Sequence, residues 1–226
     1  MGLYEEGIRA AKEASEIAER LGDVAGQANA LIKLSWALHR DNQLNEAEEV
    51  VSQVIDLLSG RDERFHLCEC HYLLGRIYRP KNDTEKAIRH FETALGLASS
   101  FNGLNALFCI HYDLAWLFID QARFDDANSH AQHAKLYAVN DHDSYALARA
   151  MRLQARVWYG QDRFEEARSE ALRAADAFEK LGLVEDAERI RRLLQRFDDE
   201  IRAGGTSNES DDNGESLATG LLPTCY

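Results

Sequence analysis

The stretch NDTEKAIRHFETAL, residues 82–95, decides the fold because its pattern recurs along the chain. Asn82, followed by Glu85 three residues later, is typical of the start of a helix. Apolar and small side chains then follow at helical spacing, at Ala87, Phe91 and Ala94. Taken alone, the stretch predicts one amphipathic helix that begins near residue 83.

Similar residues recur at intervals of 40 positions. One column holds only small residues, namely Gly7, Ala47, Ala87, Ala127 and Ala167. A second column holds small or modest apolar residues, namely Ala14, Val54, Ala94, Ala134 and Ala174. Between them, a small residue is followed three positions later by a large one, in the pairs Ser35 and Leu38, Gly75 and Tyr78, Ala115 and Phe118, and Ala155 and Trp158. Such self-similarity predicts a repeat architecture.

Each predicted unit is a pair of helices joined by a short polar turn such as PKNDT or QDRFE. Acidic residues recur in the first turn of the second helix, at Glu46, Glu85, Asp125 and Glu165. The helix dipole favours negative charge there by roughly 0.3–1 kcal/mol. Because the carboxylates recur wherever a helix starts, we interpret them as architecture and not as a general acid and base. The chain is therefore not expected to be an enzyme.

The residues Leu74, Gly75, Tyr78, Ala87, Phe91 and Ala94 resemble the signature of the tetratricopeptide repeat family. The usual period of that family is about 34 residues. The longer spacing here is similar to a variety found in signalling scaffolds and NLR-like sensor arms. The resemblance covers about residues 1–182. It implies an all-α, right-handed superhelical solenoid of antiparallel helix hairpins with about ten helices.

The predicted organisation is a helical solenoid over residues 1–202 and a disordered acidic tail over residues 203–226. The solenoid divides into a half-repeat (1–21), four full repeats (about 24–181) and a capping helix (183–202). In repeat register, residues 2–21 are a second helix without a first. This favours a chain that is the C-terminal piece of a longer solenoid over one that begins with a half-repeat cap. The tail ends in LLPTCY, either an untethered terminus or a short docking motif.

The bulk composition excludes several function classes. The net charge of -13 argues against nucleic acid and anionic membranes as partners, because phosphate binding needs clustered lysine and arginine. No apolar run reaches the roughly 18 residues that a membrane span needs. The acidic start is unlike a signal peptide, so we expect a cytoplasmic protein.

The sequence contains one cluster of potential metal ligands and no pattern typical of a cofactor site. Residues 65–71, FHLCECH, gather two histidines and two cysteines. On a helix, however, Cys68 and Cys70 point about 200° apart. The glycine-rich segments lack the spacing of phosphate-binding loops. We therefore predict neither a metal nor a cofactor.

The family resemblance implies that the first helices line a concave groove. The positions that face such a groove give the candidate peptide-binding residues Asn29, Lys33, Trp36, Arg40, Tyr72, Arg76, Arg79, Tyr112, Trp116, Arg149, Arg152, Arg156 and Tyr159. Tryptophan, tyrosine and arginine often carry interface energy. The excess of arginine predicts an acidic, hydrophobic protein or peptide ligand. The alternative is that the aromatic residues form core between repeats and the arginines pair with acids on facing helices.

The favoured function is a protein–protein interaction module that binds a peptide or a partner domain. One alternative is a regulatory sensor arm of a larger NLR-like or transcription-regulator protein. The remaining alternative is a helical-repeat enzyme.

Overall fold

The computed structural model describes residues 2–202, which form ten α-helices and no strand. The helices are α1 (Gly2–Leu21), α2 (Val24–Arg40), α3 (Leu44–Leu57), α4 (Arg64–Tyr78), α5 (Thr84–Ser100), α6 (Leu104–Asp120), α7 (Phe124–Asn140), α8 (Ser144–Gly160), α9 (Phe164–Lys180) and α10 (Val184–Arg202). The all-α prediction with about ten helices is confirmed. The tail predicted at 203–226 lies outside the described residues.

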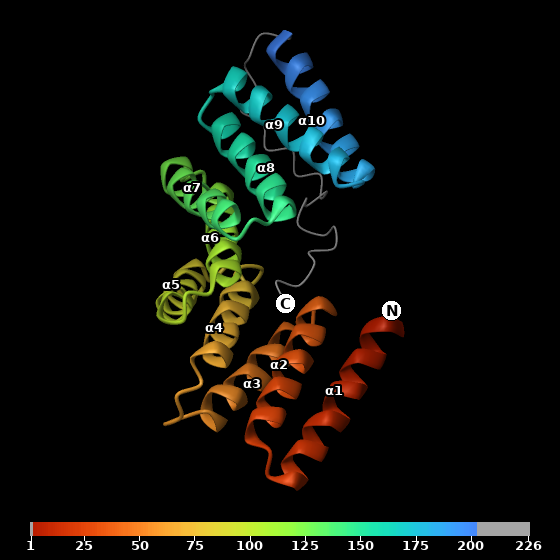
Figure 1. The fold of residues 1–226 in the computed structure, drawn as a ribbon, viewed down its shortest axis with the longest axis vertical. Coiled ribbons are helices and arrows are strands. Elements are labelled where there is room, and N and C mark those ends of the chain that lie inside the picture. The colour runs from red at the N-terminus through yellow and green to blue at the C-terminus, as the bar shows by residue number, and fades with distance from the viewer. Residues whose placement is uncertain (1, 203–226) are drawn as a thin grey trace. The chain divides into compact units, whose positions relative to one another are not determined.

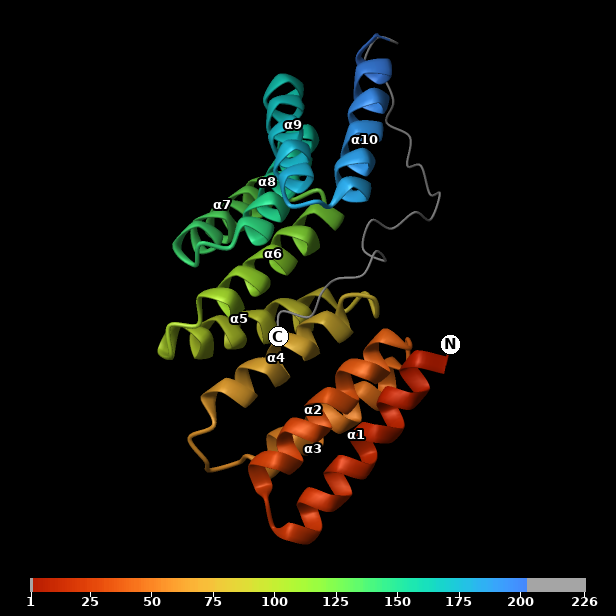
Figure 2. The same cartoon turned by 45° about the vertical axis from the view of Figure 1, so that its right-hand side comes forward.

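The chain divides into two compact units between Leu117 and Phe118, inside α6. Within unit 1, α1 packs on α2, α2 packs on α3 and α4, and α4 packs on α5 (Figures 1 and 2). Within unit 2, α8 packs between α7 and α9, and α10 packs on α9. The assignment of half-repeat, repeats and cap within one domain stays a prediction.

Helix starts recur at the spacing that the sequence predicts. We call α2, α4, α6 and α8 first helices, and α3, α5, α7 and α9 second helices. First helices begin at Val24, Arg64, Leu104 and Ser144, and α10 begins in the same register at Val184. Second helices begin at Leu44, Thr84, Phe124 and Phe164. Each hairpin therefore begins 40 residues after the one before it, although the helices differ in length by up to three residues.

The turns that join the first and second helix of each hairpin share a left-handed residue two positions before the second helix starts. Its φ is 61° at Asn42, 57° at Asn82, 56° at Ala122 and 59° at Asp162. Asparagine and aspartate tolerate this conformation better than alanine does. Asn82 therefore serves as the turn residue and does not cap α5, although its spacing from Glu85 is typical of a cap. Asp83 is the N-cap, and its carboxylate accepts a hydrogen bond from the Lys86 N–H at 3.2 Å.

The small-residue columns lie where helices approach most closely. Ala47, Ala87, Ala127 and Ala167 are all 0% exposed, and so are Val54, Ala94, Ala134 and Ala174. Gly75 in α4 shows why size matters there. A Cβ atom added at Gly75 would lie 2.6 Å from the ring of Phe91 in α5. The hairpin α4–α5 can therefore close only with glycine at this position or with a shift of Phe91.

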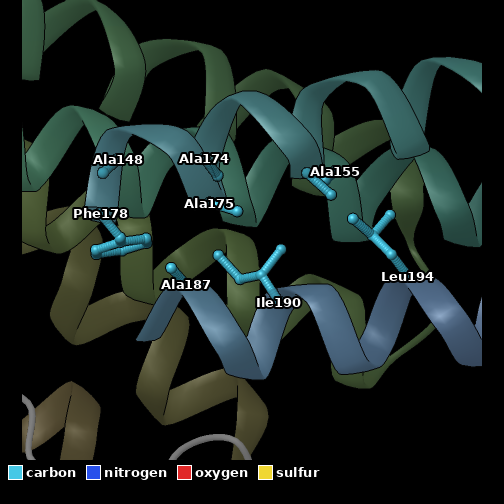
Figure 3. Packing of buried hydrophobic residues seen from close by; sticks show 9 residues of the cluster. Ala148, Ala155, Ala174, Ala175, Phe178, Ala187, Ile190 and Leu194 are labelled. Carbon is cyan, nitrogen blue, oxygen red and sulfur yellow. The ribbon is translucent and has the colours of Figure 1, made fainter. Parts of the chain in front are cut away.

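Unit 2 ends in a continuous apolar cluster, shown in Figure 3. It joins α8, α9 and α10 through Ala148, Ala155, Ala171, Ala174, Ala175, Phe178, Ala187, Ile190 and Leu194. The α10 members lie on one side of that helix. Glu185, Glu188, Arg191 and Arg192 are exposed elsewhere on it. Ala187, Ile190 and Leu194 of α10 are thus covered, and charged residues are exposed on other sides of the described part of this helix.

Candidate binding surfaces on the first helices

In unit 1, a cluster centred on Arg76 joins three first helices. The Tyr72 hydroxyl donates a hydrogen bond of 2.7 Å to Oδ2 of Asp113, and Nε of Arg76 lies 3.6 Å from the same oxygen. The Arg76 guanidinium carbon lies 5.1 Å from the Trp36 ring centroid and 5.9 Å from that of Tyr72. We call Trp36, Tyr72, Arg76 and Asp113 the Arg76 cluster.

Most of the Arg76 cluster is interior. Trp36 is 9% exposed, Tyr72 is 3% exposed and Asp113 is 5% exposed. The Arg76 side chain keeps 17% of its surface exposed, but Asp113 already balances its charge. Tyr112, another predicted ligand contact, is 2% exposed. At these positions the structure agrees with the alternative of core aromatics and paired arginines. Tyr72 and Tyr112 cannot contact a partner without movement of their neighbours.

Two titratable groups near this cluster have shifted pKa values. Burial, helped by the charge of Arg76, lowers the pKa of His39 to about 4, so this imidazole is neutral at pH 7. Burial raises the pKa of Glu69 to about 7, against the opposing charges of His66 and Lys33. Glu69 therefore exchanges a proton near neutral pH, and the charge of this face changes with it.

The accessible candidates of unit 1 surround the buried cluster. Asn29, Lys33 and Arg40 are exposed on α2. Arg79, the residue directly after α4, and Trp116 on α6 are half-buried. A partner that approaches this face meets cationic and amide groups first and reaches aromatic surface between them.

In unit 2, arginines on α8 lie beside aromatic rings. The guanidinium carbon of Arg149 lies 5.7 Å from the Tyr145 ring centroid, and that of Arg156 lies 5.6 Å from the Tyr159 ring. The guanidinium carbon of Arg152 lies 5.7 Å from the Phe178 ring centroid. Such pairs contribute about 0.5–1 kcal/mol at exposed sites.

The α8 arginines differ in accessibility. Arg149 is 6% exposed, so it is part of the buried interior of unit 2. Arg152 is 24% exposed and lies 4.0 Å from a carboxylate oxygen of Asp186 on α10. Arg156 is exposed and Tyr159 is half-buried. Arg156 is therefore the predicted contact that a ligand of unit 2 can reach most directly.

Two polar groups on second helices, the half-buried His90 and the buried Glu170, were not predicted from the sequence. Nδ1 of His71 lies 3.0 Å from Nδ1 of His90, and the Tyr78 ring stacks on His90 at 5.4 Å. In unit 2, Glu170 is 2% exposed and lies 2.5 Å from Nζ of Lys135. His90 and Glu170 fall in one 40-residue column with Ala10, Val50 and His130, and the polar side chains in that column were the available signal.

The potential ligands of residues 65–71 do not converge. Cys68 and Cys70 are free and buried, and burial raises the pKa of each thiol to about 12. His71 contacts His90 instead. Among residues 2–202, no three His, Cys, Asp or Glu side chains gather in a metal-binding arrangement. No helix in the same range is both long and apolar enough to cross a membrane.

Comparison with known proteins identifies the fold class. Residues 69–101 match the tetratricopeptide repeat family. A search of curated protein sequences finds no match. The described chain therefore contains a tetratricopeptide repeat and has an all-α, tetratricopeptide-like helical-repeat fold, as the sequence predicted. Its assignment to the long-repeat variety stays a prediction.

Two solved structures share this fold at low sequence identity. BtubC (BKLC) from P. vanneervenii matches with a TM-score of 0.63 and 16% identity, over 97% of both chains. Rap protein complexed with Competence and Sporulation Factor matches with a TM-score of 0.60 and 14% identity. That match covers 87% of this chain and 59% of the Rap chain. At these identities the likeness shows the fold alone.

Proposed function

We propose that this chain is a protein-interaction module that binds a peptide or a partner domain on the faces of its first helices. The observation that carries the proposal is exposed Arg156 on α8, whose guanidinium carbon lies 5.6 Å from the ring centroid of the half-buried Tyr159. A guanidinium fixed in this way loses less side-chain freedom when a partner binds. Arginine, tryptophan and tyrosine are also the residues that most often dominate interface energy.

The charge of the accessible groups favours an acidic and hydrophobic ligand. Lys33 and Arg156 are exposed cations in a chain whose net charge is -13. A ligand carboxylate can pair with either cation, and an apolar ligand side chain can cover the half-buried rings of Trp116 or Tyr159. Tyr72, Tyr112 and Arg149 hold the surrounding helices in place under this proposal.

The structural comparisons support the proposal only through the fold. The Rap structure shows that a protein with this fold can be crystallised with a bound factor. No residue role is transferred from it. No observation favours the sensor-arm or enzyme alternatives, so the proposal stays with an interaction module.

The test is a displayed library of 15-residue peptides, sorted by charge and selected on the full chain. We expect enrichment of acidic-hydrophobic peptides over their charge-inverted counterparts. Arg156→Glu should weaken peptides that bind unit 2 about tenfold, and Lys33→Glu should do the same for peptides that bind unit 1. Arg89→Glu is the matched control, because it makes the same charge change at an exposed position on the second helix α5.

Two results would overturn the proposal. One is equal enrichment of acidic and charge-inverted peptides. The other is affinity that Arg156→Glu and Lys33→Glu change no more than Arg89→Glu does. Arg76→Glu is a poor test, because it also leaves the buried Asp113 carboxylate without its cation.

A further inference from the structure

The sequence that follows α10 has the composition that we propose for a ligand of α8. Residues 203–226 contain no basic residue and four acidic ones, namely Glu209, Asp211, Asp212 and Glu215. Three leucines come after the acids, namely Leu217, Leu221 and Leu222. We call residues 209–222 the tail segment. An acidic and hydrophobic sequence is thus joined to the same unit as the α8 surface.

Helix α8 is the most basic of the ten helices. It carries three arginines and no acidic residue. Helix α2 comes next, with Lys33, Arg40 and no acid. Helix α10 has five arginines and six acids, so it is close to neutral. An acidic segment in unit 2 is therefore attracted mainly to α8.

The accessible groups of α8 fit both parts of the tail segment. Arg156 is exposed, and its guanidinium carbon lies 5.6 Å from the ring centroid of the half-buried Tyr159. Arg152 keeps 24% of its side chain exposed and lies 4.0 Å from a carboxylate oxygen of Asp186 on α10. A carboxylate of the segment can pair with Arg156, and a leucine can cover the Tyr159 ring.

The direction of α10 brings the start of the tail to the correct end of α8. Helices α8 and α10 both pack on α9. In Figure 3, Ala148 of α8 and Ala187 of α10 lie toward one end of the cluster, and Ala155 and Leu194 lie toward the other. The two helices therefore run in the same direction. Both end on the side of unit 2 where Arg156 lies.

The connection is long enough for the tail segment to return along α8. Helix α10 continues for eight residues after Leu194, which is about 12 Å at 1.5 Å per residue. Six residues, 203–208, separate α10 from Glu209. Fully extended, six residues span about 20 Å. Glu209 and the acids after it can therefore reach Arg156.

We propose that the tail segment occupies the α8 surface at Arg156 and Tyr159 and thereby competes with external ligands. The inference rests on the proposed function, because it uses the same surface. A short linker gives the segment an effective concentration of about 1 mM, so a dissociation constant of about 100 µM suffices to fill the surface in about nine molecules of ten. A weak contact thus becomes an effective block.

The test compares the unaltered full chain with a full chain whose tail acids are neutral. We call the second protein the tail-neutral chain, and its substitutions are Glu209→Gln, Asp211→Asn, Asp212→Asn and Glu215→Gln. The probe is a fluorescent peptide of residues 206–222, and its binding is measured by fluorescence anisotropy. We expect the probe to bind the tail-neutral chain about tenfold more tightly, because no acidic tail segment then competes for α8.

Matched variants of the tail-neutral chain locate the binding surface. Arg156→Glu should weaken the probe at least fivefold. Arg168→Glu makes the same charge change at an exposed position on the second helix α9, and it should change the affinity less than twofold. Circular dichroism melts check that both variants keep the fold.

Three results would overturn the inference. The first is binding of the probe to the tail-neutral chain that is no tighter than to the unaltered chain, including no binding to either. The second is an affinity that Arg156→Glu changes no more than Arg168→Glu does, which would place the tail segment on another surface, such as α2. The third is a dimer of the unaltered chain in sedimentation equilibrium that the tail-neutral chain does not form, which would make the tail of a second copy the occupant.

The two proposals fail in different ways. Displayed acidic peptides that bind and are weakened by Arg156→Glu, together with a failed probe experiment, would leave the proposed function in place and remove the tail contact. A probe that behaves as expected while no displayed peptide is enriched would show the reverse. The α8 surface would then bind the chain's own tail segment and no external ligand.

Discussion

The helices α1 and α5 are the same element of the repeat in opposite surroundings. Ala94 on α5 is 0% exposed beneath α4, whereas Ala14 at the equivalent place on α1 is exposed. The role of a small residue in this chain therefore depends on whether another helix covers it. On a covered helix small residues allow two backbones to approach, and on an uncovered helix they leave a shallow apolar surface.

The repeat register shows that some exposed positions of α1 are buried in every second helix. The hydrophobicity of α1 alone does not show this. Most exposed residues of α1 are charged or small, so its composition resembles that of an ordinary solvated helix. Comparison with four covered helices identifies Gly7 and Ala14 as positions that normally lie in an interface.

The largest effect is expected from a carboxylate placed in the shared column. Ala94→Glu would bury an unpaired charge between α4 and α5, which costs about 3 kcal/mol or more of unfolding free energy. Ala14→Glu should change the unfolding free energy by less than about 0.5 kcal/mol, as exposed substitutions usually do. Urea denaturation followed by circular dichroism measures both. Similar losses in the two variants would show that α1 is covered after all.

A smaller effect is expected where α4 meets α5. The Cβ atom in Gly75→Ala would lie 2.6 Å from the Phe91 ring, and such overpacking costs about 1–3 kcal/mol. Gly96→Ala on the same hairpin is the control, because nothing lies within 4 Å of its added Cβ atom. The difference between their urea midpoints gives the cost of close approach. A stable Gly75→Ala variant would show that α4 does not cover α5 closely.

Acidification should weaken the covered hairpin. Burial lowers the pKa of both His71 and His90 from the ordinary value of 6.5, and the charge of His90 lowers the pKa of His71 further. The folded state therefore binds fewer protons than the unfolded chain, so stability falls as the pH drops below about 6.5. The limiting slope is about 1.4 kcal/mol per pH unit for each proton.

The variant His90→Gln isolates this effect from the other groups that face the pair. Glu48 favours the charge of His90 and Lys86 opposes it, and Glu69 has an opposite pH dependence because its pKa is raised. Urea denaturation between pH 5 and pH 8 should show a shallower acid loss for His90→Gln than for the unaltered chain. Ala10→His, at the same column of α1, should add no such slope. Equal slopes in all three proteins would contradict the buried histidine pair.

The smallest effect is a gain in stability on α1. Nothing lies within 4 Å of a Cβ atom added at Gly7, which sits in an exposed helix interior. Gly7→Ala should therefore raise the unfolding free energy by about 0.5–1 kcal/mol through helix propensity alone. A rise in the urea midpoint without a change in slope would agree. A loss of stability would indicate an unrecognised contact beside Gly7 on α1.

Much of the fold was predictable, because columns of small residues fix both the register and the side of each helix that is covered. The helix starts needed one more fact. Asn82 and Asp162 have side chains suited to capping a helix. In the structure they instead adopt the left-handed conformation that the turn requires. The cap then moves to Asp83, and to Arg163, which makes no side-chain cap bond.

The accessible part of the candidate site could not be predicted from helix spacing. Tyr72 and Asp113 are 41 residues apart, and their hydrogen bond depends on how two first helices are rotated against each other. That rotation buries Tyr72 and pairs Arg76, whereas Arg156 at the equivalent place on α8 stays exposed. The repeat position predicts which side of each first helix carries the candidate residues. The packing of the helices then decides which of these residues are exposed and which are buried.

The left-handed turn residues mark equivalent positions between which whole repeats could be added or removed. Asn42, Asn82, Ala122 and Asp162 are followed by second helices, and they recur at the same 40-residue interval as the helices themselves. Duplicating or deleting one 40-residue repeat between two equivalent turns would therefore connect a first helix to a second helix through the same kind of turn as before. Longer or shorter repeat arrays could be built by adding or removing such 40-residue repeats. Ala122→Asn or Ala122→Gly would relieve the turn whose left-handed residue, alanine, is least suited to positive φ.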